Sequence, residues 1–259
     1  MEYAVLASGS SGNSYAFSDG DDSFLIDMGI SNTQLEKRMA LFSFAPEDVR
    51  CIFLTHLHPD HSKGVGTFQR KHPDVPVYMS SVAFQMNKTV LEKQRITGPV
   101  VQYDFNEEIA IGSFTVTPFK TMHDSPGSAG YLVRHGNNRI FLMTDTGMIT
   151  EDAFSYAEGN DVYFIEANYD ADMLENGPYD AKLKKRIDGI YGHLSNSDAI
   201  SFAKRYAKAG STCIFVHLSE NNNDVSIVEK EMHSNLSSGI FLKAMKRGDS
   251  YKGVLDEED

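Results

Sequence analysis

The chain has 259 residues, of which 41% are hydrophobic and 11% aromatic, enough for a sizeable core. No apolar run is long enough to span a bilayer, and the first residues lack the basic segment of a signal peptide. The formal net charge of −12 argues weakly against a nucleic-acid-binding protein, unless bound cations offset the carboxylates. The two cysteines lie in apolar runs and predict buried thiols, which suits a reducing cytoplasm. We expect one cytoplasmic domain over residues 1–255, without a membrane segment, and an acidic tail over residues 256–259.

Glycines and short apolar runs at the start of the chain predict closely spaced strands. These strands are expected over residues 2–7, 13–18 and 23–27. A helix is expected from about 32 to 41, because Ser31 and Gln34 have the spacing of a capping box. The elements expected next are a buried strand over 51–54, a helix near 63–72, a strand over 75–79 and a helix around 81–94.

From about residue 100 the pattern is again rich in strands, which are expected over 114–117, 129–134, 139–144, 161–166 and 212–216. A helix from about 196 to 209 has Ser195 as its cap and ends at Gly210, and a last helix lies near 224–234. Residues 168–190 are polar and are expected to be irregular. Because both halves of the chain run strands first and helix after, we expect two similar halves packed sheet to sheet, with the helices outside.

Residues 55–61 concentrate three imidazoles and a carboxylate directly after a buried strand. Pro59 is expected to end regular structure there, so that a loop carries the candidate ligands. These candidates are His56, His58, Asp60 and His61. The first two can point the same way from an extended segment, whereas the last two follow the turn and can face a second point. One loop can thus serve two neighbouring metal ions; the alternative is a polar surface loop that happens to be rich in histidine.

Three further residues of ligand type follow predicted strands: His123, Asp145 and His217. With the loop they make seven candidate ligands, about the number that a dinuclear site needs when one carboxylate bridges the ions. Each of the three taken alone could have a structural role instead. Three other histidines, in a charged run, a hairpin turn and a surface helix, are expected outside the site: His72, His135 and His233.

Three more polar residues lie near predicted element ends. Asp27 ends a strand before Gly29 and can anchor the metal loop by hydrogen bonds, or cap a turn. Glu166 ends another strand, and His193 precedes a capped helix. A carboxylate that orients an imidazole makes a good proton donor or acceptor near neutral pH. Each of the two alone could be structural, so their role depends on whether they meet in space.

The order of the ligands resembles that of the metallo-β-lactamase superfamily: His-x-His-x-Asp-His in the loop, then His123, Asp145 and His217. The resemblance covers nearly the whole chain. Within that superfamily the chain is most similar to the YycJ/WalJ (VicX) group of bacterial proteins. The stretches that carry this similarity are 7–14, 143–147, 176–179, 192–196 and 217–222. The resemblance implies an α/β fold, a four-layer αββα sandwich with its site at the edges of the sheets.

The pattern of the superfamily also implies a division of the ligands between two divalent ions. His56, His58 and His123 would hold one ion, Asp60, His61 and His217 would hold the other, and Asp145 would bridge them. Five imidazoles favour zinc, and manganese or iron also accepts this set.

Glu166 and His193 resemble the acid/base pair of the tRNA-processing ribonuclease branch of the superfamily. Together with Asp60 they are the catalytic residues that the resemblance implies. One departure is Tyr169, at a position where that branch leads us to expect histidine in an Asn-His-Asp run. The departure leaves the predicted ligands untouched and concerns the loop expected to face the substrate.

Residues and resemblance together predict a two-metal phosphodiesterase, a 5′ to 3′ exonuclease that acts on DNA rather than RNA; the polarity rests on the resemblance alone. In the expected mechanism a hydroxide shared by the two ions attacks phosphorus in line, and His193 protonates the leaving oxygen. The loop with Ser10 and Asn13 offers groups for a terminal phosphate, or is simply a tight hairpin loop. One basic cluster can contact a nucleic-acid backbone or form a solvated face: Lys182, Lys184, Lys185 and Arg186.

Two alternatives remain on the same residues. A carbonyl hydrolase, such as a lactonase or thioesterase, can use the same ligand set, because fold does not decide function. The second alternative is a metal-binding regulatory or scaffold protein of a cell-envelope signalling operon, although a scaffold does not need seven intact ligands. A close pair of Glu166 and His193 favours a phosphodiesterase over a carbonyl hydrolase. In the carbonyl hydrolase the leaving alkoxide would be bound to a metal and would need less help from an acid.

Overall fold

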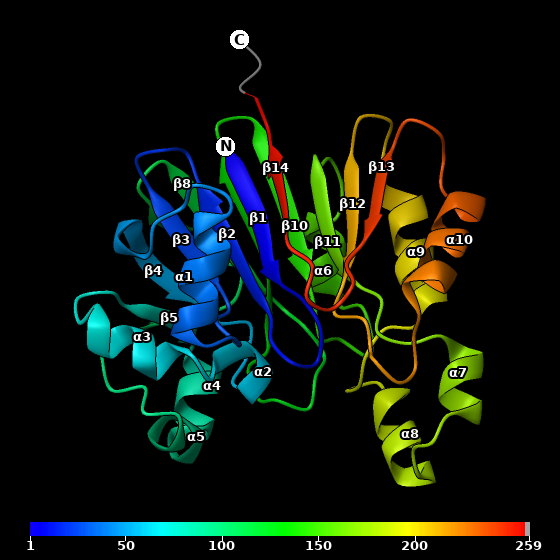
Figure 1. Ribbon diagram of the computed structural model, residues 1–259, viewed down its shortest axis with the longest axis horizontal. Coiled ribbons are helices and arrows are strands. Elements are labelled where there is room, and N and C mark those ends of the chain that lie inside the picture. The colour runs from blue at the N-terminus through cyan, green and yellow to red at the C-terminus, as the bar shows by residue number, and fades with distance from the viewer. Residues whose placement is uncertain (257–259) are drawn as a thin grey trace.

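The computed structural model describes residues 1–256 and has two seven-stranded sheets packed face to face, with helices on both outer faces (Figure 1). The predicted αββα sandwich is therefore confirmed. The first sheet has the strand order β14, β1, β2, β3, β4, β5, β6, and the second has β13, β12, β11, β10, β9, β8, β7. Of the predicted acidic tail, residues 257–259 lie outside the described part of the chain.

The strands of the first sheet are β1 (Glu2–Ala7), β2 (Ser14–Ser18), β3 (Ser23–Ile26), β4 (Val49–Phe53), β5 (Val77–Ser80), β6 (Val100–Tyr103) and β14 (Tyr251–Val254). Those of the second sheet are β7 (Ile109–Ile111), β8 (Phe114–Lys120), β9 (Ala129–His135), β10 (Asn138–Met143), β11 (Val162–Glu166), β12 (Thr212–Val216) and β13 (Phe241–Ala244). The last strand, β14, returns to the first sheet and pairs antiparallel with β1. The two halves of the chain are thus joined by an exchange that the sequence pattern did not predict.

The helices beside the first sheet are α1 (Asn32–Ala40), α2 (Pro59–Ser62), α3 (Val65–Lys71), α4 (Ser81–Met86) and α5 (Lys88–Lys93), with a 3₁₀ turn at Pro46–Asp48. Those beside the second are α6 (Glu151–Tyr156), α7 (Ala171–Asn176), α8 (Ala181–Ile187), α9 (Asn196–Tyr206) and α10 (Val225–Asn235). No helix in the described part of the chain is long and apolar enough to cross a membrane.

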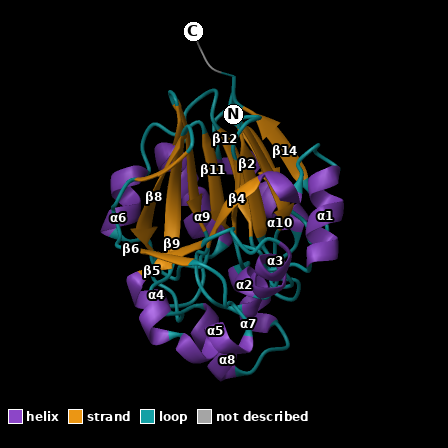
Figure 2. Cartoon of the chain, turned by 90° about the vertical axis from the view of Figure 1, so that its left-hand side faces the viewer, coloured by secondary structure: helices purple, strands orange, loops and turns teal. Residues whose placement is uncertain are grey.

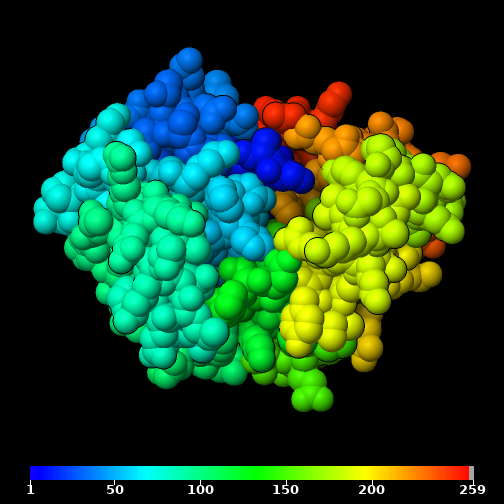
Figure 3. Space-filling view, turned by 90° about the horizontal axis from the view of Figure 1, so that it is seen from below, coloured from blue at the N-terminus to red at the C-terminus, as the bar shows by residue number. Residues whose placement is uncertain are grey.

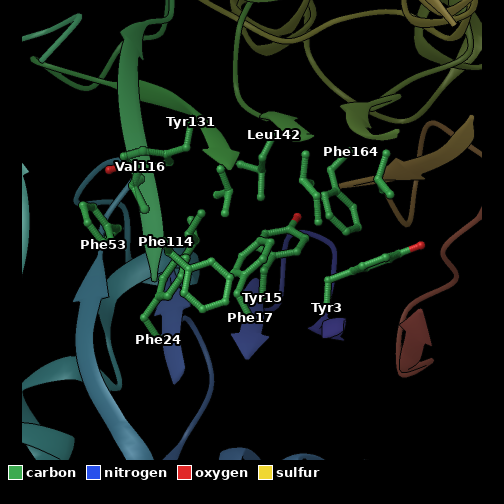
Figure 4. Close-up of a cluster of buried hydrophobic side chains, with 14 of the residues drawn as sticks. Tyr3, Tyr15, Phe17, Phe24, Phe53, Phe114, Val116, Tyr131, Leu142 and Phe164 are labelled. Atoms are coloured by element: carbon green, nitrogen blue, oxygen red, sulfur yellow. The ribbon is translucent and has the colours of Figure 1, made fainter. Parts of the chain in front are cut away.

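Aromatic side chains from both sheets fill the space between them (Figure 4). Phe24 of β3 packs edge-on against Phe114 of β8, with ring centroids 5.2 Å apart. Tyr15 of β2 meets Phe164 of β11 at 5.5 Å. Such pairs contribute beyond the area they bury, roughly 0.5–1.5 kcal/mol each. The sheets therefore hold their mutual position firmly, which fixes the edge on which the site is built.

Several predicted elements differ from those in the structure. Residues 168–190, expected to be irregular, contain α7 and α8, because Asp170 and Asp180 cap them with side-chain hydrogen bonds to backbone N–H groups. The helix expected around 81–94 divides at Asn87, whose φ and ψ of −117° and 27° are not helical. Pro59 does not end regular structure but begins α2, where its missing N–H costs nothing.

Strands β3 and β4 run parallel, as do β10, β11 and β12. Their carboxyl ends meet at one edge of the sandwich. The end of β8 lies at the same edge, because β9 is antiparallel to both β8 and β10 and β8 therefore runs in the direction of β10. In Figure 2 this edge lies below the orange strands, where loops and short helices gather. In open α/β sheets this is the edge at which ligands bind.

Candidate metal centre

The loop after β4 owes its shape to a buried aspartate on the neighbouring strand. Asp27 follows β3 with a left-handed backbone (φ 60°) and is fully buried. Its carboxylate accepts hydrogen bonds from the Thr55 backbone N–H (2.8 Å) and hydroxyl (2.7 Å). It also lies 2.6 Å from Nδ1 of His61. Asp27 therefore sets the position of the loop and leaves Nε2 of His61 facing the site.

The first ligand group consists of His56, His58 and His123, whose donor nitrogens lie within 4.8 Å of one another. Nδ1 of His58 is 3.2 Å from Nε2 of His123. The other ring nitrogen of His123 contacts the Gly192 carbonyl at 3.0 Å, and Nδ1 of His56 contacts the Thr55 hydroxyl at 3.0 Å. These contacts orient the rings so that one nitrogen of each points to a common centre.

The second ligand group consists of Asp60, His61 and His217. Oδ2 of Asp60 is 3.5 Å from Nε2 of His61 and 3.4 Å from Nε2 of His217. His217 follows β12 with a left-handed backbone, and its N–H donates to the Ser8 hydroxyl at 2.7 Å. Residues 157 positions apart in the chain thus meet in one group.

Asp145, after β10, lies between the two groups. Its Oδ2 is 3.2 Å from Nε2 of His61 in the second group, and its Oδ1 is 3.8 Å from Nε2 of His123 in the first. The structure therefore brings all seven candidate ligands together. The three histidines expected outside the site do lie elsewhere: His72 stacks on Phe68, His135 contacts Asp19, and His233 is on α10.

Two buried atoms show that this cluster suits metal ions. Nε2 of His56 has no hydrogen-bond partner among the described residues, and the 3.2 Å contact of Oδ2 of Asp145 with His61 is an ion pair without hydrogen-bond geometry. Buried polar atoms normally have a partner, so such atoms aimed at one centre need an explanation. Imidazole nitrogens and carboxylate oxygens in this number are the donors of a two-metal site. The clusters are consistent with a binuclear metal centre.

The charges around the two groups differ. Burial lowers the pKa of all three imidazoles in the first group, so these rings are neutral and have lone pairs to donate. Burial acts in the same direction in the second group, but nearby carboxylates outweigh it. They raise the pKa of His61 well above its usual range and that of His217 to about 10. The second group therefore lies in a negative potential, which a bound cation relieves.

Glu166 and His193 meet beside the clusters. Oε1 of Glu166 is 2.6 Å from Nδ1 of His193 and 2.9 Å from Nδ1 of His217. Its Oε2 accepts the backbone N–H groups of Thr146 (3.0 Å) and Leu194 (3.3 Å). Burial opposes ionisation, yet the charges and hydrogen bonds of the two histidines lower the pKa of Glu166. One buried carboxylate thus orients both the candidate acid and a candidate metal ligand.

The clusters open into a cleft of about 240 Å³, lined among others by Ser10, Tyr179 and Arg186. Figure 3 shows the hollow between the blue and cyan segments of the first half and the yellow segment that contains α8. Nε of Arg186 pairs with Asp124 at 2.5 Å. The other oxygen of Asp124 lies 3.5 Å from Nε2 of His58. Of the predicted basic cluster, Arg186 is thus the member that lines this cleft.

The residues predicted to bind a terminal phosphate are placed differently. Ser10 is exposed and lines the cleft. Asn13 is buried: its amide bonds to Gly9 at both ends, at 2.9 and 3.1 Å, and contacts Nε2 of His61 at 3.0 Å. Its hydrogen-bonding groups are used by Gly9 in its own loop and by Asp60 and His61 of α2, so Asn13 shapes these segments instead of facing a substrate. Tyr169 is also buried and donates to Asp188 at 2.6 Å, supporting α7 and α8.

Sequence reasoning missed two residues of the centre. Thr55 links Asp27 to His56, and Asp124 links Arg186 to His58. Each is the direct neighbour of a predicted ligand, Thr55 before His56 and Asp124 after His123. Adjacency was the available signal, but adjacent side chains often point apart.

The chain belongs to the β-lactamase superfamily: the model described as "Beta-lactamase superfamily domain" matches residues 23–218. The chain is 31% identical over 254 residues to Exodeoxyribonuclease WalJ of Streptococcus pneumoniae, covering 94% of this chain and 93% of that protein. It is 29% identical to Exodeoxyribonuclease YycJ of Bacillus anthracis, over 86% of this chain and 84% of that one. The metallo-β-lactamase fold protein YhfI of Bacillus subtilis superposes with a TM-score of 0.71 at 21% identity, over 97% and 98% of the two chains.

Proposed function

We propose that this protein is a metal-dependent phosphodiesterase that degrades DNA as an exonuclease in the 5′ to 3′ direction. The observation that carries the proposal is the 2.6 Å contact of Glu166 with His193 directly beside seven convergent ligand-type side chains. The two relatives named exodeoxyribonucleases support the choice of DNA, because their similarity extends over most of both chains.

His56, His58 and His123 would hold one divalent ion, and Asp60, His61 and His217 the other, with Asp145 between them. Two such ions, when bound, supply a nucleophile at neutral pH and neutralise charge on the phosphoryl oxygens. The set of five imidazoles and two carboxylates favours zinc, with manganese or iron as alternatives. Asp27 and Glu166 keep the imidazoles of His61 and His217 in the orientation that ligation requires.

His193 would supply the proton that the departing oxygen needs. Its Nδ1 is held by Glu166, which leaves Nε2 to face the cleft, and the side chain is 14% exposed. Glu166 orients this imidazole, as a positioned general acid requires. Arg186 and Ser10 line the same cleft and would contact the phosphate backbone, the former through its guanidinium.

The test is incubation of metal-loaded protein with end-labelled single- and double-stranded DNA and RNA, with products separated on a gel. The proposal expects stepwise shortening of DNA from the 5′ end, abolished by a chelator and restored by zinc, manganese or iron. His193→Ala serves as the matched control for a contaminating nuclease. Hydrolysis of lactones or thioesters with no attack on any polynucleotide would instead establish the carbonyl-hydrolase alternative.

A further inference from the structure

A second cavity, of about 600 Å³, lies beside the metal cleft and shares Ser10 and Asp60 with it. Its walls come from the loop after β1, from α1, from α2 with the residue that follows it, and from the turn between β13 and β14. In Figure 3 the dark blue loop after β1 lies next to the red segment near the end of the chain. The volume falls within the roughly 300–1,000 Å³ that small-molecule sites occupy.

Three basic side chains line this cavity: Arg38, Lys63 and Arg247. Arg247 pairs with Glu220. Within residues 1–256, neither Arg38 nor Lys63 forms an ion pair with a carboxylate side chain. Nζ of Lys63 donates to the Ser11 carbonyl at 2.8 Å. Two cations in one cavity thus have neutral partners, in a chain whose net charge is −12.

Arg38 lines the cavity and is half-buried. Its Nη1 donates to the Leu6 carbonyl and lies 3.4 Å from both the Asp249 carbonyl and the Ser250 hydroxyl. Burial lowers the pKa of the guanidinium, and the charge of Asp249 opposes that effect. A partly desolvated guanidinium that bonds mainly neutral oxygens gains most from an anion with several acceptor oxygens.

We propose that this cavity, the Arg38–Lys63 pocket, binds a phosphate of the polynucleotide next to the phosphodiester that lies at the metal centre. The proposal rests on the proposed function, because continuity through Ser10 and Asp60 is what makes the ligand part of the same strand. The phosphate is either the terminal monoester or the neighbouring diester; both offer negatively charged acceptor oxygens, whereas the present partners of Arg38 and Lys63 are neutral. The pocket also has hydroxyl groups, from Ser10 and Ser11, for the sugar or phosphate.

The experiment measures binding without cleavage. Fluorescence anisotropy of a 3′-labelled oligodeoxynucleotide is followed in chelator across a series of salt concentrations, for the wild type, Lys63→Gln and Lys37→Gln. Lys37 is an exposed residue of α1 outside the pocket, so it is the charge-matched control. We expect Lys63→Gln to weaken binding roughly tenfold at low salt and to reduce the slope of log K against log salt by about 1. Arg38→Lys, which keeps the charge but not the fork, should weaken binding at nearly unchanged slope.

Oligonucleotides with a 5′-phosphate or a 5′-hydroxyl distinguish the two phosphate sources. An effect of Lys63→Gln that disappears with the hydroxyl end assigns the pocket to the terminal monoester, and one that persists assigns it to the diester. The proposed phosphate site would be refuted if Lys63→Gln and Lys37→Gln had equal slopes of log K against log salt, or if the wild type bound neither oligonucleotide. This binding assay involves neither metal nor turnover. If the oligonucleotide binds as expected here but the metal-loaded protein does not cleave DNA in the gel assay, the proposed function is refuted while the binding pocket is retained.

Discussion

Three side chains of the metal centre follow strands with a left-handed backbone: Asp27 (φ 60°), Asp145 (φ 53°) and His217 (φ 57°). This conformation is uncommon for residues other than glycine, although aspartate and histidine adopt it more often than most. The turn of the chain directly after the strand directs each side chain across the sheet edge instead of along the strand. Backbone strain of this kind concentrates at functional sites, where the surrounding structure holds it in place.

The acid role of His193 predicts a dependence on the leaving group. His193→Ala should keep both metals and the fold, yet lose roughly 10²–10⁴-fold in turnover of DNA, the usual contribution of a positioned acid. A nitrophenyl phosphodiester should be much less affected, because its leaving group departs without a proton. Steady-state kinetics on both substrates measures the difference. Equal losses on the two would remove His193 from the acid role.

Glu166→Gln should weaken metal binding as well as the acid role of His193. Oε1 faces Nδ1 of both His193 and His217, while Oε2 accepts two backbone N–H groups, so an amide must oppose donors at one end. We expect metal affinity at the second ligand group to fall roughly 10- to 100-fold, in addition to the loss seen for His193→Ala. Metal titration of the two variants side by side tests this. If Glu166→Gln retained both ions at wild-type affinity, the role of Glu166 would be limited to orienting His193.

At the scale of elements, the site depends on how closely α2 approaches the loops after β1 and β3. The Asn13 N–H donates to the Asp60 carbonyl at 2.7 Å, and the Gly29 N–H donates to the Asn13 carbonyl at 2.8 Å. A Cβ on Gly29 would lie 1.6 Å from the Asp60 carbonyl oxygen. The three backbone segments are therefore packed without room for a side chain, which fixes Asp60 and His61 in the second ligand group.

Gly29→Ala should therefore displace α2. We expect a loss of stability of about 1–3 kcal/mol from overpacking, and less than two equivalents of metal by elemental analysis. Gly20→Ala is the control: its Cβ would meet nothing within 4 Å, so it costs only the left-handed backbone of that turn. Urea denaturation and metal content of both variants decide the matter. If Gly29→Ala bound two equivalents as tightly as the control, the close approach of α2 would be irrelevant to the site.

At the scale of the whole molecule, the two sheets are also joined at the end away from the site. Asp19, in the turn between β2 and β3, accepts hydrogen bonds from the N–H groups of Asp21 (3.0 Å) and Asp22 (2.7 Å). It also bonds Ser113, in the turn between β7 and β8, and lies 3.3 Å from Nε2 of His135 in β9 of the second sheet. Burial raises the pKa of Asp19, but these hydrogen bonds outweigh it and bring the pKa to about 2.

This contact predicts a pH-dependent stability. The pKa of Asp19 in the folded state lies below its ordinary value of 3.8, so ionised Asp19 stabilises the fold above about pH 4. That contribution, at most roughly 2.5 kcal/mol, is lost as the pH falls toward 2. Asp19→Asn should have a lower free energy of unfolding than the wild type at pH 7, and this difference should be smaller at pH 3. Urea denaturation at the two pH values measures it. Asp21→Asn, in the same turn but exposed, should show no such difference; identical behaviour of the two variants would contradict the prediction.

The sequence alone determined what local patterns can determine. Strands could be recognised as apolar runs, and the starts of helices by capping residues such as Ser195. Residues of ligand type, such as His123 and His217, could be recognised because they directly follow predicted strands. Parallel strands place their carboxyl ends at one edge, so a correct list of strand ends is already close to a list of site residues. The convergence of the seven side chains was predictable for this reason. Their order along the chain also carried the resemblance that implied the metallo-β-lactamase fold.

Only the tertiary structure decided the contacts between residues far apart in the chain. The sharing of Glu166 between His193 and His217, the inward turn of Asn13 and the pocket around Arg38 and Lys63 depend on side-chain directions after the sheets have packed. The pairing of β14 with β1 likewise joins the two ends of the described chain. Such contacts have no sequence period, because they arise from the packing of segments whose separation along the chain is arbitrary.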